Sequence, residues 1–353
     1  MPAVALLGAG IFAKEEHLPA VEAASDLTLA AVYSRSQKSA EALAAAATQG
    51  PKPDVYYDSP ATEGKSLKDL LARKDVDGVI VSLPILVQPA VIIQALAAGK
   101  HVLSEKPIAK DVAAAKALIE NYSKIGSGAP IWGVAENFRF LEVILYAASQ
   151  IRKIGGDVTT FSMKMNTLIG DDDKFFNTEW RKVPEYQGGF LLDGGVHFIA
   201  GLRYLLGETE AKHDISKVSA FTTLLQPKLA PVDTVQSILT TDKGAIGTFC
   251  VSFGTEFKSA FEIEVVTTKG NVTLAPTAVT STWVETAGGE KKEDKKEFSF
   301  SAGVKPEIVA FAASLSKGVV DPRQSPQQAL KDLAILEALL ASADKGGAPL
   351  TVE

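Results

Sequence analysis

A carboxylate and an imidazole stand four residues apart in the segment LLDGGVHFIAGLRYLLG, at Asp193 and His197. On a helix, residues at this spacing lie on one face and are close enough to interact. An imidazole exchanges protons near neutral pH, which suits general acid and base catalysis. The same face continues through Ala200 and Gly201, so we expect their small side chains to leave space for a ligand beside the histidine.

A glycine-rich segment, GAGIFA, directly follows an apolar, strand-like run near the start of the chain. Gly8 permits a tight turn, Gly10 lets the backbone approach a pyrophosphate, and Ala13 is the small third residue that helix–strand packing needs. The amides at the start of the following helix then face the phosphates. This order of strand, glycine turn and helix predicts a Rossmann dinucleotide site that includes Ile11 and Phe12.

The residues after the second predicted strand indicate which dinucleotide is bound. A carboxylate in this place accepts hydrogen bonds from the ribose hydroxyl of NAD. This chain instead has Ser34, Arg35 and Lys38 there. The two cations can pair with a 2′-phosphate, so the sequence favours NADP(H) over NAD(H). The alternative is that Arg35 is a surface arginine at a strand end.

A lysine, Lys106, follows the strand-like run at 101–105 and precedes Pro107. Ligands of parallel sheets bind at the carboxyl ends of the strands. An ammonium group there can donate hydrogen bonds to a substrate oxygen and stabilise charge on it. Glu105 can set the orientation or the pKa of this lysine. The alternative is that Glu105 and Lys106 form a surface ion pair.

Short β-branched runs alternate with alanine-rich segments in the first third of the chain, which predicts a parallel sheet with helices on both faces. Strands are predicted at 3–7, 27–33, 54–57, 78–83, 101–105 and 130–136, and helices at 11–24, 37–47, 66–73, 86–98 and 111–125. The apolar segment 78–99 raises the question of a membrane helix. Pro84, Gln88 and Pro89 interrupt it, so a buried strand followed by a helix is expected.

Beyond about residue 140 the strands follow one another without helices, which indicates a mostly antiparallel sheet. Helices are predicted at 139–153 and 326–344, and strands at 157–167, 218–226, 233–241, 244–253, 261–268, 271–276 and 281–287. We predict an α/β fold with an N-terminal Rossmann domain over residues 1–130 and a C-terminal α+β domain, with an open sheet, over 131–353. The amphipathic last helix is expected to pack back on the core, and the charge run at 289–297 to form a solvated hairpin tip.

Composition restricts the classes of function. The net charge is −6 and no basic cluster is present, so nucleic-acid binding is not expected. The single cysteine, Cys250, allows no intrachain disulfide and fits a reducing, cytoplasmic location. The chain has four histidines and none pairs with another at ligand spacing, so no metal site is predicted.

Three motifs together, GAGIFA, AAGKHVLSEKPIA and LLDGGVHFIAGLRYLLG, resemble the Gfo/Idh/MocA oxidoreductase family over nearly the whole chain. The resemblance implies that Lys106 lies at the reaction centre and that His197 is the general acid/base. It implies that Asp193 is the partner of that histidine or a substrate ligand. It also implies a cis peptide bond before Pro107.

Weaker matches extend this resemblance. In ENFRF, Asn137 is expected to contact the nicotinamide or the substrate, and Arg139 to be structural. Trp180 and Arg181 resemble a pair that approaches the nicotinamide end, with a core aromatic as the alternative for Trp180. The predicted cofactor-binding set is Gly8, Gly10, Ile11, Phe12, Ser34, Arg35, Lys38, Leu83, Pro84, Gln88, Glu105, Asn137, Trp180 and Arg181.

The resemblance implies a dehydrogenase that transfers hydride between NAD(P) and a small sugar- or cyclitol-like substrate. The alternatives are a lyase or hydrolase that uses bound NAD(P) transiently, and a cofactor-sensing regulator that performs no catalysis. Ala200 and Gln88 stand where many relatives carry an acidic residue and a histidine, so the substrate of better-known members is not transferred. Relatives often cover the open sheet in dimers or tetramers, so a homo-oligomer is expected, without a membrane or nucleic-acid partner.

Overall fold

The computed structural model describes residues 1–59 and 63–353, which divide into two compact units. The first unit comprises Met1–Asn137 and Ala302–Leu330, and the second comprises Phe138–Ser301 and Lys331–Glu353. A single boundary at residue 130 does not describe this division, because the chain returns to the first unit after residue 301.

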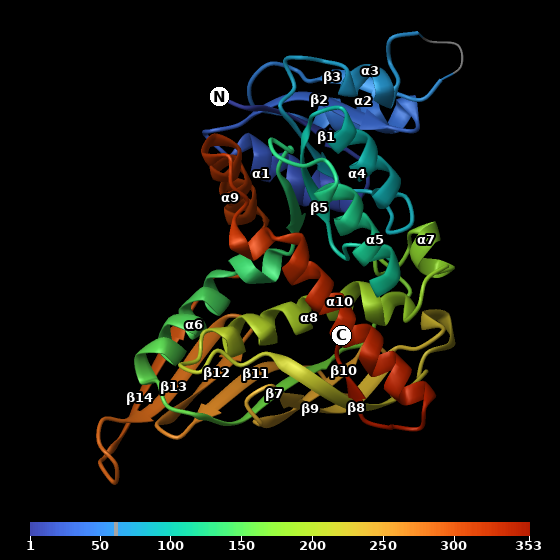
Figure 1. Cartoon of the computed structure of the whole chain (residues 1–353). Helices are drawn as coiled ribbons and strands as arrows, with labels where there is room; N and C mark the ends of the chain where they lie inside the picture. Colours follow the sequence, from blue (N-terminus) through green and yellow to red (C-terminus); the bar gives the residue numbers. More distant parts are fainter. Residues whose placement is uncertain (60–62) are drawn as a thin grey trace. The chain divides into compact units, whose positions relative to one another are not determined.

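A parallel sheet of six strands forms the centre of the first unit, as the sequence predicts (Figure 1). The strand order is β3-β2-β1-β4-β5-β6, so the direction of winding reverses between β1 and β4, the switch point at which ligands bind in such sheets. All four residues of β4 are buried, as expected for a strand covered on both faces. The strands are β1 (Ala3–Leu7), β2 (Thr28–Ser34), β3 (Asp54–Tyr57), β4 (Gly78–Val81), β5 (His101–Glu105) and β6 (Trp132–Ala135).

Helices cover this sheet, and side-chain caps begin several of them. Ser36 caps α2, and Asp111 caps α5 by accepting a hydrogen bond from the Ala114 N–H at 2.7 Å. The helices are the π-helical turn η1 (Ala13–His17), α1 (Leu18–Glu22), α2 (Gln37–Ala46), α3 (Leu67–Leu71), α4 (Gln88–Ala97), α5 (Val112–Ser123), α9 (Val304–Lys317) and the short η4 (Pro322–Gln324). The sequence pattern did not indicate α9, which packs through Ile308 and Phe311 into the core formed around α1.

A sheet of nine strands forms one layer of the second unit. Its order is β14-β13-β12-β11-β7-β10-β9-β8-β15, and the β10–β7 pair is parallel while every other neighbouring pair is antiparallel. The mostly antiparallel sheet of the prediction is therefore confirmed. The strands are β7 (Val158–Asn166), β8 (Ile215–Thr223), β9 (Thr234–Thr241), β10 (Ile246–Ser252), β11 (Ala260–Thr267), β12 (Gly270–Ala275), β13 (Ala278–Val284), β14 (Lys291–Glu297) and β15 (Leu350–Thr351).

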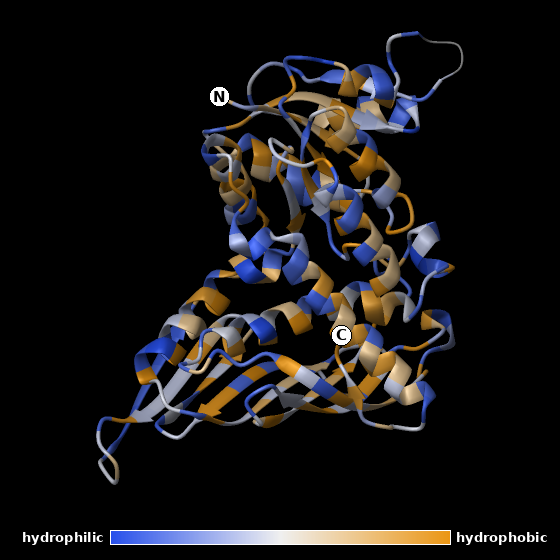
Figure 2. Ribbon diagram, viewed as in Figure 1, coloured by the Kyte–Doolittle hydropathy of each residue, from blue (hydrophilic) through white to orange (hydrophobic). Residues whose placement is uncertain are grey.

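The charged run that was expected to form a hairpin tip contains the edge strand β14. All seven of its side chains are exposed, and the strand is hydrophilic in Figure 2. Main-chain pairing with β13 explains this strand, because the ladder needs no apolar side chain. A charged edge also resists pairing with another chain.

Helices cover one face of the nine-stranded sheet. The long helix α8 (Gly189–Gly207) packs against β11, and α6 (Glu142–Ile154) packs against β12 and β13. The helix α10 (Pro326–Asp344) has the predicted bounds, and it passes from the first unit to the second after Leu330. The remaining short helices are η2 (Asn137–Phe140), α7 (Glu179–Lys182) and η3 (Pro227–Leu229). Of the helices that the structure describes, none is both long enough and apolar enough to cross a membrane.

Candidate active site

The glycine turn after β1 has the geometry that a bound pyrophosphate requires. Gly8 has φ +114°, and a Cβ atom there would lie 2.0 Å from the carbonyl oxygen of Ser82. A Cβ atom on Gly10 would meet nothing within 4 Å, so the space beside this glycine is open. The backbone is helical from Ile11 onward, which leaves the first amides of the helix available to an anion. These features fit a dinucleotide.

Most of the other predicted cofactor residues lie at the same edge of the first unit's sheet. Because all six strands are parallel, their carboxyl ends share one edge. The residues at or just after these ends are Ser34 on β2, Leu83 and Pro84 after β4, Glu105 on β5 with Lys106 after it, and Asn137 after β6. These residues are therefore placed where ligands of parallel sheets bind.

Two cations flank the end of β2. Arg35 and Lys38 are exposed and lie on either side of Ser36, the residue that caps α2. Among the residues that the structure describes, neither cation has an ion-pair partner. Both are therefore available to a phosphate group.

Two amide side chains of the predicted set differ in their hydrogen bonding. Gln88 begins α4 and is 1% exposed, and neither of its amide atoms has a hydrogen-bond partner in the described part of the chain. The Asn137 amide instead donates a hydrogen bond to the carbonyl oxygen of Ala302 at 2.7 Å. Asn137 therefore holds the returning segment of the first unit, while Gln88 retains capacity for a ligand or a water molecule.

The carboxylate before Lys106 has a partner that no sequence motif indicates. The Nε2 atom of His17 lies 2.6 Å from Oε1 of Glu105, and the His17 side chain is completely buried. The other oxygen of the carboxylate accepts the backbone N–H of Lys106 at 3.2 Å. The peptide bond before Pro107 is cis, as the resemblance implies. The two partners are 88 residues apart, so no local spacing indicates this pair.

The second unit carries Asp193 and His197 on α8, which confirms the helix that their spacing predicts. Asp193 is 4% exposed, and its Oδ2 atom accepts a hydrogen bond from Nε of Arg181 at 2.7 Å. The guanidinium also lies over the Trp180 ring, 3.9 Å from its centroid. Burial raises the pKa of the nearby Tyr186 hydroxyl, and the negative charge of Asp193 raises it further. The structure therefore joins Trp180, Arg181 and Asp193 in one cluster.

His197 is partly buried, and its ring stacks on Phe138, with the ring centroids 4.9 Å apart and the planes at 19°. The expected open space beside it is not present at Gly201, where a Cβ atom would meet Ile144, Ile263 and Phe138 at 3.2–3.4 Å. The expectation was wrong because α6 and β11 pack closely against this face of α8. Glycine here permits close packing and does not line a cavity.

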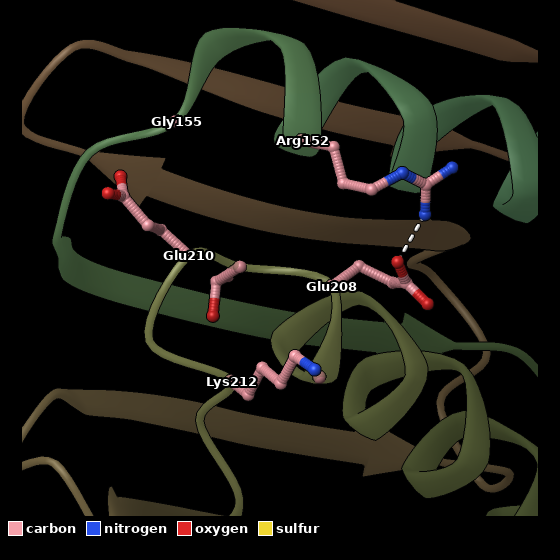
Figure 3. A pocket seen from close by; sticks show the side chains of 7 residues that line it. Arg152, Gly155, Glu208, Glu210 and Lys212 are labelled. Carbon is pink, nitrogen blue, oxygen red and sulfur yellow. Dashed lines mark hydrogen bonds and ion pairs between the residues drawn. The ribbon is translucent and has the colours of Figure 1, made fainter.

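A pocket of about 300 Å³ lies elsewhere in the second unit, at the carboxyl ends of α6 and α8 (Figure 3). It is lined by Arg152, Gly155, Gly207, Glu208, Thr209, Glu210 and Lys212. Arg152 pairs with Glu208 across it. His197 is ten residues before the end of α8, which corresponds to about 15 Å along the helix axis. None of the predicted site residues lines this pocket.

Comparisons with known proteins agree with both units. Residues 3–127 match a family model described as "Oxidoreductase family, NAD-binding Rossmann fold", and residues 152–273 match one described as "GFO/IDH/MocA C-terminal domain". The chain is 50% identical to Dehydrogenase FPY6 of Fusarium mangiferae, over 97% of each chain. It is 31% identical to a dTDP-3,4-didehydro-2,6-dideoxy-alpha-D-glucose 3-reductase of Streptomyces violaceoruber, over 58% of this chain and 54% of that one. The crystal structure of an oxidoreductase from Thermotoga maritima aligns with a TM-score of 0.84 and 30% identity, over 99% of this chain and 98% of that one.

Proposed function

Because the chain belongs to the Gfo/Idh/MocA family of NAD(P)-binding oxidoreductases, we propose that it transfers hydride between NADP(H) and a carbinol or carbonyl carbon of a sugar- or cyclitol-like substrate. The observation that carries the proposal is the placement of Lys106 at the same sheet edge as the glycine turn of Gly8 and Gly10. The family establishes oxidoreductase chemistry, and the cofactor preference and substrate class are the proposal.

Support for NADP(H) comes from the end of β2. The exposed Arg35 and Lys38 replace the carboxylate that would accept hydrogen bonds from an unphosphorylated ribose. Their charges suit a 2′-phosphate, which a guanidinium binds through two parallel N–H groups. The nicotinamide, when bound, supplies the acceptor or donor of the hydride.

The chain's own residues would handle the proton and the oxygen. In the oxidative direction, His197 takes the hydroxyl proton while the carbon loses hydrogen with its electron pair, and a C=O bond forms. Lys106 donates hydrogen bonds to that oxygen and stabilises the negative charge that develops on it. Asp193 is held by Arg181 and completes the set as a substrate ligand or as the partner of His197. In the reductive direction, His197 returns the proton to the oxygen.

Support for a polyhydroxylated substrate comes from the relatives' names. The Fusarium mangiferae protein is named a dehydrogenase, and the Streptomyces violaceoruber protein is named for reduction of a deoxysugar nucleotide. The second name describes reduction at carbon 3 of a sugar. A sugar or a cyclitol is therefore the substrate class to screen first.

The test is a fluorescence titration with NADPH and NADH of the wild-type chain, Arg35→Ala and the control Lys124→Ala. Lys124 is another exposed cation of the first unit, and it pairs with Glu120 on α5. We expect Arg35→Ala to weaken NADPH binding about 10- to 100-fold, the loss typical of a charge-assisted hydrogen bond. NADH binding and the control should change less than about threefold.

Other outcomes of this titration count against the proposal. Equal losses for both cofactors would contradict recognition of a 2′-phosphate by Arg35. Binding of neither cofactor, after retained endogenous cofactor has been removed, would favour a regulator. Turnover of a substrate without added or regenerated cofactor would favour a lyase or hydrolase that retains its own.

We also propose that the chain forms a homodimer or homotetramer through the uncovered face of the nine-stranded sheet. Phe221 on β8, Ile238 on β9 and Ile246 on β10 are 64%, 56% and 57% exposed on adjacent strands. Contiguous exposed apolar side chains often mark a protein interface. Light scattering should give a multiple of 37.3 kDa, and Ile238→Lys should reduce it toward the monomer. A wild-type monomer would contradict the proposal.

A further inference from the structure

We propose that His17 is a positioning residue for Lys106, acting through the Glu105 carboxylate. The inference rests on the proposed role of Lys106 at the reaction centre. This inference assigns a function to a buried histidine. Neither the glycine turn nor the lysine after β5 explains why a histidine is needed there.

The geometry fixes His17 closely. Its side chain is 0% exposed, and Nε2 lies 2.6 Å from the Glu105 carboxylate, which is itself 13% exposed. The rings of His17 and Phe12 pack edge to face, with their centroids 5.3 Å apart and their planes at 81°. The imidazole therefore has one polar contact and one aromatic contact, and its ring orientation is set by both.

Glu105 connects the fixed imidazole of His17 to the backbone of Lys106. One carboxylate oxygen is held by His17, and the other accepts the backbone N–H of Lys106 at 3.2 Å. The carboxylate thus links η1, directly after the glycine turn, to the end of β5, where Lys106 begins its loop. Loss of the His17 contact would free the carboxylate and, with it, the backbone of Lys106.

The contact shows which ring nitrogen of His17 faces the carboxylate. The Nδ1 atom of His17 is buried and has no hydrogen-bond partner among the described residues. A neutral imidazole that donates Nε2–H to Glu105 leaves one unpaired acceptor, whereas an imidazolium would leave an unpaired, charged donor. Because a carboxylate oxygen accepts, the proton of this contact lies on Nε2, and Nε2–H donates to Glu105.

Stability alone does not require this arrangement. A buried polar pair can often be replaced by apolar side chains of similar volume without loss of stability. What the pair supplies here is a defined direction for the carboxylate that holds Lys106. Positioning of a reacting group matters because a displacement of about 1 Å can reduce turnover about 100-fold.

The experiment compares two substitutions of His17 by amide residues whose side chains differ in length. Gln in His17→Gln places an NH₂ group near the position of Nε2, whereas Asn in His17→Asn places it near Nδ1, too far from Glu105. Both are polar and uncharged, so their difference isolates the hydrogen bond to the carboxylate. The control is His101→Asn, at another histidine of the first unit, whose Nδ1 accepts the Ile131 N–H at 2.8 Å and which makes no contact with Glu105 in the structure.

Two readouts are needed, and the first requires no substrate. Lysines are reductively methylated with ¹³C-formaldehyde, and the Lys106 resonance is assigned as the one missing from Lys106→Arg. We expect His17→Asn to move or broaden this resonance while those of other lysines stay, and His17→Gln and His101→Asn to leave it near the wild-type position. With a turned-over substrate, kcat of His17→Asn should fall about 10- to 100-fold with KM within about threefold. His17→Gln should restore most of this loss.

An unchanged Lys106 resonance in folded His17→Asn would overturn the inference, as would an equal effect of His17→Gln or His101→Asn. Failure of the proposed function looks different. If Lys106→Ala keeps its turnover, Lys106 is not at the reaction centre, although the resonance still reports whether His17 holds it in place.

Discussion

Each of the two units holds a carboxylate close in the chain to a candidate reactive residue, and the two carboxylates have different nitrogen-bearing partners. In the first unit Glu105 contacts the imidazole of His17 at 2.6 Å, and in the second Asp193 contacts the guanidinium of Arg181 at 2.7 Å. An imidazole titrates near neutral pH, whereas a guanidinium stays charged at every pH a protein survives. The first pair is therefore a hydrogen bond from an imidazole, and the second is an ion pair between a guanidinium and a carboxylate.

The two pairs also differ in how the chain builds them. His17 and Glu105 are 88 residues apart and meet because β1 and β5 belong to one parallel sheet. Arg181 and Asp193 are 12 residues apart, in the segment that leads into α8. The first pair thus depends on the whole sheet of its unit, whereas the second depends on one local segment.

The largest expected effects remove the reactive candidates themselves. Lys106→Ala should reduce kcat about 10²- to 10³-fold, the usual loss of a group that stabilises a developing oxyanion. His197→Ala should reduce it about 10²- to 10⁴-fold, as expected for a general acid/base. Steady-state kinetics with NADP(H) check both, and NADPH affinity should stay within about threefold. Turnover within threefold of the wild type in either variant would remove that residue from the mechanism.

A smaller effect is expected on stability when the guanidinium pair is broken. Arg181→Leu removes the charged hydrogen bond from Nε to Asp193, whose side chain is 5% exposed. We expect a loss of about 1–3 kcal/mol in the free energy of unfolding, measured by urea titration at pH 7.

A control separates the charge from its geometry. Arg181→Lys keeps the charge but not the planar group that lies over Trp180. It should recover only part of the stability lost in Arg181→Leu. Full recovery in Arg181→Lys would show that the stacking contributes nothing.

The contrast between the two pairs explains what the sequence predicts and what it does not. Alternation of strands with helices indicates the parallel sheet, and Asp193 and His197 share α8 because helix periodicity is local. The edge strand β14 forms through main-chain pairing, which side-chain polarity does not reveal. The His17–Glu105 contact depends on how two distant strands are ordered in the sheet, so no spacing along the chain indicates it.

The missed helix α9 has a similar explanation. Its N-cap is Gly303, which offers no side-chain oxygen, and Pro306 lies in its first turn. Proline is tolerated there because the first amides of a helix have no intrahelical acceptor. The side-chain oxygen that most clearly marks a helix start is therefore absent, and burial of Ile308 and Phe311 against α1 stabilises the helix.

The smallest expected effect is the loss of stability of the second unit at mildly acidic pH. Because the Arg181–Asp193 pair contains a cation that does not titrate near neutral pH, we expect His213 to contribute to the mild-acid sensitivity of the second unit. This histidine is 5% exposed, its Nδ1 lies 2.9 Å from the Thr241 hydroxyl, and burial lowers its pKa below the ordinary value, with Asp242 opposing the shift.

The direction of the effect follows from proton binding by the two states. When the pH falls below about 6.5, the unfolded chain binds a proton at His213 that the folded unit does not yet bind. The stability that neutral His213 contributes is thus fully present above that pH, and it is lost as the pH falls through the lower folded-state pKa. The slope for this one proton is at most about 1.4 kcal/mol per pH unit.

Hydrogen exchange of β9, measured between pH 7.5 and 5.5 and corrected for intrinsic rates, reports the second unit alone because β9 contains Thr241. His213→Asn, which keeps a polar atom near Thr241 without titrating in this range, should flatten the pH dependence of the opening free energy. Arg181→Leu should lower that free energy by a similar amount at each pH. If His213→Asn keeps the wild-type slope, the acid response of this unit comes from other groups, and burial of this imidazole has no measurable part in it.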